Sequence, residues 1–204
     1  MGYDYDIFLT YLRSNPLSLQ WVNDIFYPLF EPLVSEAANA HVRIFKDTES
    51  IMSGMNWKNR IKQALAHSKI MVPVFSPLYF QSKWCLREFT AMYYRQCQLN
   101  LATINNPNGL ILPVKIFDGQ HFPQQAADIH TLDCTSYFRV GEAVKTSLIY
   151  LELQEKLIGW VDQVAAAIQA APAWDAAWKS DAWLEDPYKN WAPIPPARFN
   201  APKL

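Results

Sequence analysis

The sequence predicts an α/β fold in which a five-stranded parallel sheet carries helices on both of its faces. Short apolar runs that suit buried strands alternate along the chain with longer segments of helical periodicity. The runs are continuously apolar, which is typical of strands that are covered on both faces. The 204 residues, half of them hydrophobic and 14% aromatic, are enough for one domain with a substantial core.

Five segments are predicted as strands, and in chain order they cover residues 7–11, 41–45, 70–75, 110–117 and 129–133. Pro73 and Pro113 interrupt two of these runs, and proline lacks the amide donor that a sheet uses. We keep both strands in the prediction because the flanking residues are apolar or β-branched.

The segments between the strands have helical spacing. Pro28 and Pro32 interrupt the apolar stretch 17–34, so we expect a kinked or divided helix there. Two shorter helices are predicted over residues 57–65 and 82–99. A long helix is predicted over about residues 147–171, with a core-facing side made of Leu148, Leu151, Leu157, Ile158, Val161, Val164 and Ile168.

The amino-acid composition of the chain changes at Pro172. The following residues contain four tryptophans among Ala, Asp and Lys, and then a proline-rich stretch. Four tryptophans are unusual in a disordered linker. We therefore expect residues 1–171 to form the domain and residues 172–204 to form an extension that packs on the domain or on a partner.

The composition disfavours several classes of partner. The formal net charge is −1, so no overall basic character points to nucleic acid. The N-terminus is acidic and lacks the basic-then-apolar order that is typical of a signal peptide, and no uncharged apolar run is long enough to cross a bilayer. Three cysteines without C-x-x-C spacing predict free thiols in a reducing compartment. We therefore expect a soluble, cytoplasmic protein that binds neither nucleic acid nor membrane directly.

The common cofactor and metal signatures do not occur in this sequence. It contains no G-x-G-x-x-G and no G-x-x-x-x-G-K, and its four histidines have no metal-ligand spacing. We therefore expect neither a resident cofactor nor a metal.

The segment that carries the clearest chemistry begins at Ser82. A helix starting there places Trp84 and Glu88 on one face, because the two residues are four apart. The segment follows the predicted strand 70–75, and open parallel sheets bind ligands beyond the carboxyl ends of their strands. A flat aromatic surface beside a carboxylate can hold hydroxyl groups and stabilise a developing cation.

Five short motifs in this order resemble the Toll/interleukin-receptor (TIR) domain family. The segment 76–88 is similar to the family pattern S-x-x-[FY]-x-x-S-x-W-C-x-x-E, and residues 6–11 resemble its opening strand, D-[VI]-F-[IL]-[ST]-Y. The second strand, the end of the BB loop with the helix after it, and the fourth strand are matched by residues 42–47, 54–57 with Ile61, and 112–114. The resemblance covers about residues 5–171 and implies a flavodoxin-like five-stranded parallel sheet.

The resemblance, which is to the prokaryotic NAD-cleaving type, implies cleavage of NAD between nicotinamide and ribose. The family's catalytic carboxylate corresponds to Glu88, which suits a transition state with oxocarbenium character. NAD is then a substrate, and the products are nicotinamide with ADP-ribose or a cyclic relative. Expected substrate-binding residues are Thr10, Tyr11, Arg13, Asp47, Gly54, Trp57, Ser82 and Trp84. Leu12 separates Tyr11 from Arg13, whereas some NAD-cleaving members have arginine directly after the tyrosine.

Some of these residues also have a purely structural interpretation. Glu88 can be a solvated helix residue, and Trp84 can merely pack at the helix start. For Trp57 we slightly favour core packing over substrate contact. Cys85 has no histidine near it in the motif, so we interpret it as a buried hydrophobic side chain rather than a nucleophile.

The resemblance also implies partners and a setting. The BB loop, framed by Asp47, Gly54 and Trp57, mediates self-association in the family, and assembly activates the enzyme. We expect a role in bacterial antiviral defence with a separate sensor or effector protein. The main alternative is a non-catalytic TIR adaptor that scaffolds signalling. A receiver-like domain is disfavoured because Asp4 and Asp6 precede the first strand instead of following it.

Overall fold

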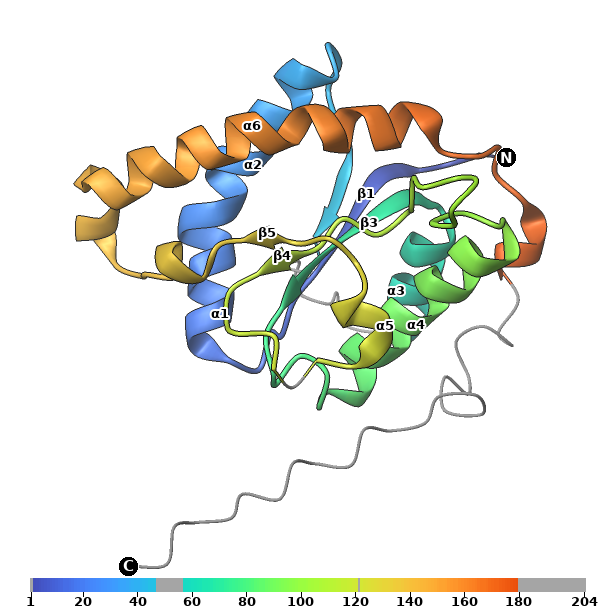
Figure 1. Ribbon diagram of the computed structural model, residues 1–204, viewed down its shortest axis with the longest axis horizontal. Helices are drawn as coiled ribbons and strands as arrows, with labels where there is room; N and C mark the ends of the chain where they lie inside the picture. Colours follow the sequence, from blue (N-terminus) through green and yellow to red (C-terminus); the bar gives the residue numbers. More distant parts are fainter. Residues whose placement is uncertain (1, 47–56, 121, 180–204) are drawn as a thin grey trace, which may run out of the picture.

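The computed structural model describes residues 2–46, 57–120 and 122–179. These residues form a five-stranded, fully parallel sheet in the order β2-β1-β3-β4-β5, as the sequence predicts (Figure 1). The strands are β1 (Tyr5–Thr10), β2 (Ile44–Lys46), β3 (Ser68–Phe75), β4 (Val114–Lys115) and β5 (Leu132–Asp133). The central pair places Leu9 opposite Val72 and Phe8 opposite Met71, so their side chains alternate between the two faces.

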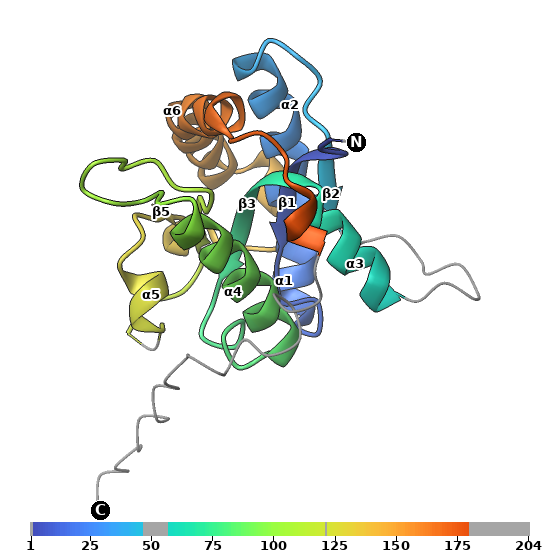
Figure 2. The ribbon, with the colours of Figure 1, turned by 90° about the vertical axis from the view of Figure 1, so that its right-hand side faces the viewer.

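Helices cover both faces of the sheet (Figures 1 and 2). They are α1 (Pro16–Trp21), α2 (Tyr27–Ala37), α3 (Trp57–Ala66), α4 (Lys83–Gln98), α5 (Gln124–Ala127) and α6 (Leu148–Ala170). The α2 and α6 helices pack together on one face, while α3 and α4 lie on the other. None of the helices in the described part of the chain is long and apolar enough to span a membrane.

The predicted helix over residues 17–34 is divided. The side chain of Asn15 accepts hydrogen bonds from the first amides of α1, and a π-helical turn, Val22–Phe26, separates α1 from α2. Pro28 lies in the first turn of α2, where its missing amide costs little. Pro32 lies inside α2, so the helix tolerates a second missing donor.

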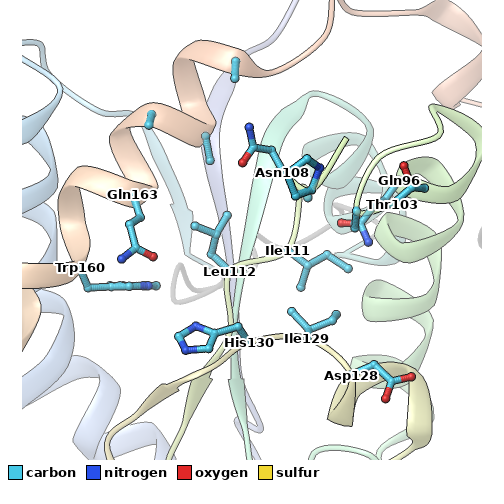
Figure 3. Close-up of a pocket in the computed structure, with 16 residues that line it drawn as sticks. Gln96, Thr103, Asn108, Ile111, Leu112, Asp128, Ile129, His130, Trp160 and Gln163 are labelled. Carbon is cyan, nitrogen blue, oxygen red and sulfur yellow. The ribbon is translucent and has the colours of Figure 1, made fainter. Parts of the chain in front are cut away.

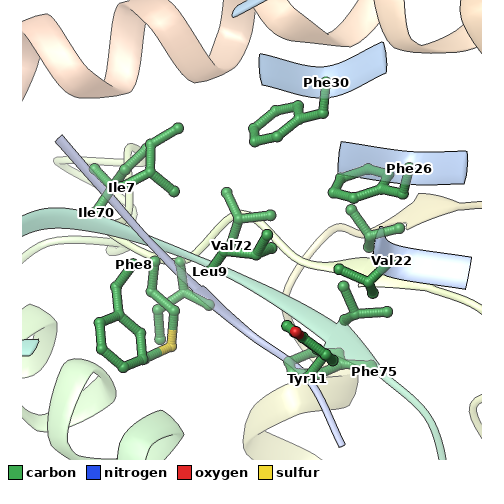
Figure 4. Close-up of a cluster of buried hydrophobic side chains, with 14 of the residues drawn as sticks. Ile7, Phe8, Leu9, Tyr11, Val22, Phe26, Phe30, Ile70, Val72 and Phe75 are labelled. Atoms are coloured by element: carbon green, nitrogen blue, oxygen red, sulfur yellow. The ribbon is translucent and has the colours of Figure 1, made fainter. Parts of the chain in front are cut away.

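The core between these helices and the sheet is strongly aromatic. Ring centroids lie 5.2 Å apart for Trp21 and Phe26, and 5.0 Å apart for Phe26 and Phe30. Figure 4 shows Phe26 and Phe30 on the side of the sheet that carries Leu9 and Val72. The row continues to Trp160 of α6, 5.6 Å from Phe30, which ties the long helix to α2.

Four of the strands are shorter or shifted relative to the prediction. The first, predicted over 7–11, is β1 at Tyr5–Thr10. The second strand, predicted over 41–45, is β2 at Ile44–Lys46. The fourth, predicted over 110–117, is reduced to two residues by Pro113, although Met71 and Ile111 still form an isolated bridge. The fifth begins at Leu132 instead of residue 129. Pro73, in contrast, remains inside β3, where it pairs with Thr10.

The prediction of which residues of the long helix face the core is wrong in part. Leu148, Leu151 and Ile158 are exposed, with exposed fractions of 67%, 56% and 49%. The buried face consists instead of Leu153, Leu157, Trp160, Val161, Val164, Ala165 and Ile168. These residues recur every three or four positions, so they share one side of the helix, and the three exposed residues fall on the other side.

Two acidic residues, Asp4 before β1 and Asp6 near the beginning of β1, hold the amino edge of the sheet together. Asp6 accepts hydrogen bonds from the amide and side chain of Arg43, and it forms an ion pair with Lys69 at 2.8 Å. Asp4 lies 3.3 Å from the Nδ1 atom of His67. Because these carboxylates face the amino edge, they do not form the acidic cluster of a receiver domain.

Candidate functional site

A cavity of about 370 Å³ lies where β1 ends. The end of β1, the first turns of α4 and the start of α3 surround it. Its lining brings together seven of the nine residues predicted for the site, namely Thr10, Tyr11, Arg13, Trp57, Ser82, Trp84 and Glu88. Asp47 and Gly54 lie outside the described residues. Phe8, Leu9, Leu12, Ser14, Leu19 and Cys85 complete the lining.

Ser82 sets the start of α4. Its backbone is extended, with φ −76° and ψ 113°, and its hydroxyl oxygen accepts a hydrogen bond from the amide of Cys85 at 3.3 Å. This is the geometry of a helix N-cap, so the Ser82 hydroxyl already has a structural role. The cap determines where α4 begins and therefore which face Trp84 and Glu88 share.

Glu88 is buried, with only 6% of its surface exposed. The Thr10 hydroxyl donates a hydrogen bond to its Oε2 atom, and the Tyr79 hydroxyl lies 3.4 Å from the Thr10 oxygen. The interpretation of Glu88 as a solvated helix residue is therefore wrong. A buried carboxyl group held by a hydroxyl donor is unusual on a helix that has a solvent-exposed side.

Two tryptophans stand together at the same cavity. The ring centroids of Trp57 and Trp84 lie 4.8 Å apart with their planes tilted by 58°. Trp57 is 38% exposed, so the interpretation of Trp57 as a core residue is wrong. Ile61 and Leu65 face the core from α3 instead. Trp84 is partly buried, and its indole N–H has no hydrogen-bond acceptor among the residues that the structure describes.

Cys85 behaves as a buried hydrophobic side chain. Burial and the neighbouring Glu88 raise the pKa of its thiol to about 12. Its Sγ atom lies 3.8 Å from the carbonyl oxygen of Tyr11, which accepts its weak hydrogen bond. A neutral thiol is a poor nucleophile, which agrees with the sequence interpretation. Burial also raises the pKa of Tyr79 well above its ordinary value, so both groups beside Glu88 stay protonated at neutral pH.

Arg13 lines the cavity from an exposed position beyond the buried Leu12. Tyr79 was not predicted as a site residue, although it occupies the aromatic position of the motif that contains Glu88. The motif spacing alone could not show that its hydroxyl lies against Thr10, because the two residues are 69 positions apart.

A second cavity, of about 680 Å³, contains none of the predicted site residues (Figure 3). It lies between α6, the end of α4 and the segments that precede β4 and β5, with His130, Asp128 and Trp160 in its wall. This is the amino edge of the sheet, whereas open parallel sheets bind ligands at the carboxyl edge. We therefore take the smaller cavity as the candidate site.

Within residues 2–46, 57–120 and 122–179, no three His, Cys, Asp or Glu side chains gather as a set of metal ligands. The chemistry available at the cavity is therefore that of a carboxyl group, two indoles, hydroxyls and one guanidinium.

Comparisons with known proteins identify relatives of this chain. A curated relative, "Probable 2' cyclic ADP-D-ribose synthase BdTIR" from Brachypodium distachyon, is 30% identical over 89 residues, or 43% of this chain. The match covers 40% of that protein, so the chain spans about two fifths of its length.

Two solved structures are similar at low identity. The TIR domains of the activated Roq1 resistosome, which directly recognises the effector XopQ, are 18% identical. The match covers 82% of this chain and 86% of that one, with a TM-score of 0.41. The TIR domain of the Toll-related receptor TRR-2 from Hydra magnipapillata is 17% identical, over 75% of this chain and 98% of that one, with a TM-score of 0.42.

The family comparison covers more than half of the chain. The TIR domain family matches residues 27–146, a range that includes the α4 segment with Trp84 and Glu88. The chain therefore belongs to the TIR domain family.

Proposed function

We propose that this chain is an NAD-consuming enzyme of the prokaryotic TIR type, which cleaves the bond between nicotinamide and ribose. The observation that carries the proposal is the position of Glu88. It is a buried carboxyl group, oriented by Thr10, in a cavity at the carboxyl edge of the sheet. The relative named as a probable cyclic ADP-ribose synthase supports NAD as the substrate.

The proposed reaction suits this set of groups. When the bond to ribose breaks, its electron pair goes to the ring nitrogen, and nicotinamide leaves as a neutral molecule. The ribosyl carbon then has oxocarbenium character, which the carboxylate of Glu88 stabilises by charge and by accepting hydrogen bonds from ribose hydroxyls. Attack by water gives ADP-ribose and a proton. Attack by a nucleophile within the same molecule gives a cyclic product.

The aromatic pair provides the second half of the proposed site. Trp57 and Trp84 offer stacking surfaces for the nicotinamide and ribose end of the substrate. The buried N–H of Trp84, which has no acceptor among the described residues, is available to donate to a ligand. Arg13 at the mouth is placed to pair with a phosphate, because guanidinium groups bind phosphate oxygens in a bidentate manner.

The wider setting of this function is also proposed. The resemblance assigns Asp47 and Gly54, which lie outside the described residues, to the BB loop, and self-association through that loop is proposed to activate the enzyme. The chain is then a cytoplasmic enzyme of bacterial antiviral defence, with a separate sensor or effector protein as its partner. Residues 1–171 are its TIR domain and residues 172–204 its extension.

The direct test is NAD consumption by the purified chain, with nicotinamide and the second product resolved by chromatography and mass spectrometry. The assay is run dilute and then concentrated with a crowding agent. We expect nicotinamide release that is abolished in Glu88→Gln. The matched control Glu152→Gln, at an exposed position on α6, should keep full activity. No release under conditions where the chain demonstrably assembles contradicts the proposal and favours the adaptor alternative.

A further inference from the structure

The segment after α6 lies against the end of the sheet that is opposite to the cavity. We call residues 172–179 the aromatic strap. The Tyr3 hydroxyl donates a hydrogen bond to the carbonyl of Pro172 at 2.8 Å, and the Trp178 ring lies 5.9 Å from that of Tyr3. Trp178 is only 8% exposed. Figure 2 shows the strap, in dark orange, beside α3 and the amino end of β1.

The strap contacts the carboxyl end of α3. The Trp174 indole N–H donates to the carbonyl of Ala66 at 3.2 Å, and Arg95 of α4 donates to the carbonyls of Leu65 and Ser68 at 2.9 Å each. The last carbonyls of a helix have no partner within the helix and carry partial negative charge. An indole donor and a guanidinium therefore cap α3 from outside.

Trp178 packs over the guanidinium group of Arg95. Its ring lies 4.5 Å from the Cζ atom of Arg95, whose side chain is 95% buried from solvent. Burial lowers the pKa of Arg95 to about 10, so the group remains a cation at neutral pH. A buried cation is costly unless it is paired, and here the helix carbonyls and the aromatic face stabilise it. Removing the ring opens Arg95 to water and weakens its hold on α3.

The same two helices meet again at the cavity. Arg95 lies in the last turn of α4, and Trp84 lies in its first turn. Leu65 lies near the end of α3, and Trp57 is its first residue. The α3 and α4 helices are thus joined at one end by Arg95 and at the other by the Trp57–Trp84 contact. A helix of ten residues is about 15 Å long, so a small tilt at its strap end displaces Trp57.

We propose that Trp174 and Trp178 are positioning residues for the NAD cavity, because they hold the carboxyl end of α3 and so keep Trp57 against Trp84. Neither residue reaches the substrate. The inference rests on the proposed function, because Trp57 is the group through which the strap acts on NAD. It assigns the first part of the extension a role in substrate affinity rather than in the bond-breaking step, whose residues lie on β1 and α4.

A double-mutant cycle tests the proposal. We expect Trp178→Ala to raise KM for NAD about three- to tenfold with kcat nearly unchanged, and to have almost no further effect in a Trp57→Ala background. Trp178→Phe, which keeps an aromatic face over Arg95, should restore KM. If the effects of Trp178→Ala and Trp57→Ala multiply independently, or if Trp178→Ala lowers kcat alone, the positioning role is wrong.

A second measurement does not depend on activity. Hydrogen exchange followed by mass spectrometry should show faster exchange of the α3 amides in Trp178→Ala, with α2 unchanged. Trp174→Phe, which keeps a ring beside His67 but removes the donor to Ala66, should give a smaller change in the same peptides. Leu151→Ala, at an exposed site on α6, is the control and should leave α3 unchanged.

The two measurements separate the two proposals. A wild-type chain that releases no nicotinamide overturns the proposed function, while the exchange rates of α3 still decide whether the strap holds that helix. Unchanged α3 protection in both strap variants overturns the further inference, whatever the activity is.

Discussion

Thr10, the last residue of β1, donates a hydrogen bond to the carboxyl group of Glu88 in the second turn of α4. The two residues are 78 positions apart in the sequence, and both are buried. Thr10 also lies 3.4 Å from the Tyr79 hydroxyl, so the end of β1 orients the carboxyl group through a short chain of hydroxyls. In the proposed reaction, a carboxyl group held in this way by packed neighbours loses little entropy when the substrate arrives.

Replacing Thr10 by valine should reduce NAD turnover about ten- to a hundredfold, because a hydrogen bond to a charged group contributes about 1.5–3 kcal/mol. Valine keeps the shape of the side chain, so the fold should persist. Thr10→Ser retains the donor and should recover most of the activity. The rates are measured as kcat/KM, with circular dichroism as the check on folding. Equal activity in Thr10→Val and wild type contradicts the orienting role.

Trp57 and Trp84 should respond differently to truncation. Trp57→Ala removes a 38% exposed ring that contacts Trp84, so it should raise KM for NAD while lowering the free energy of unfolding by no more than about 1.5 kcal/mol. Trp84→Ala removes a ring that also packs against the core, so it should both raise KM and destabilise the protein. Urea unfolding and steady-state kinetics on the two variants measure both quantities. A strongly destabilised Trp57→Ala would show that the ring serves packing after all.

The thiol of Cys85 should not react with alkylating reagents at neutral pH. Burial and Glu88 raise its pKa to about 12, whereas Cys97 is exposed. Iodoacetamide at pH 7.5 should therefore alkylate Cys97 and spare Cys85 in the native protein, as peptide mass spectrometry can determine. Cys85→Ala should retain NAD turnover within a few fold. Loss of all turnover in that variant, with its fold intact, would assign the thiol a role in the reaction.

Asp6 should make stability depend on pH in the acid range. Burial alone raises its pKa, but hydrogen bonds from Arg43 and Lys69 outweigh burial and hold the pKa below the ordinary value of 3.8. A carboxylate with a lowered folded-state pKa stabilises the fold above the unfolded-state value. That contribution is lost as the pH falls through the folded-state pKa.

The matching experiment compares Asp6→Asn with wild type by urea unfolding at several pH values. At pH 7 the variant should be less stable by about 1–3 kcal/mol, because two cations lose their buried partner. The difference should shrink as the pH falls below the ordinary Asp pKa of 3.8, and it should be lost once the pH has passed the lower folded-state pKa, where the wild-type carboxylate also becomes neutral. Asp133 is present in both proteins; burial opposes the shift, but hydrogen bonds from Lys115 and Thr135 lower its pKa to about 2, so its ion pair with Lys115 adds an acid sensitivity common to variant and wild type. A difference that is independent of pH would contradict the assignment.

Local patterns in the sequence were sufficient for much of the fold. The apolar run of β3, the start of a helix near Ser82 and the helical spacing of α3 each depend on residues a few positions apart, and the structure agrees with the predictions for them. The division of the helix over 17–34 was predictable for the same reason, because Pro28 acts on its own neighbourhood, whereas Pro32 remains inside α2 without interrupting it. The placement of Trp84 and Glu88 on one face also followed from spacing alone.

The errors arose where two elements meet. The exposed Leu148, Leu151 and Ile158 are as apolar as the residues that α6 buries, so composition could not identify the face that packs on α2. For Trp57, the sequence left core packing slightly favoured over substrate contact, but this residue begins α3 on the side where Trp84 lies.

The sequence by itself determined the order of the strands and main helices, the start of α4 near Ser82, and the pairing of an indole with a carboxyl group one turn apart. Tertiary structure alone decided that Thr10 orients Glu88, that Trp57 meets Trp84, and that the strap caps α3. The physical reason is the range of the interactions. Backbone hydrogen bonds, caps and periodicity act within a few residues, whereas contacts between distant residues depend on how whole helices and strands pack.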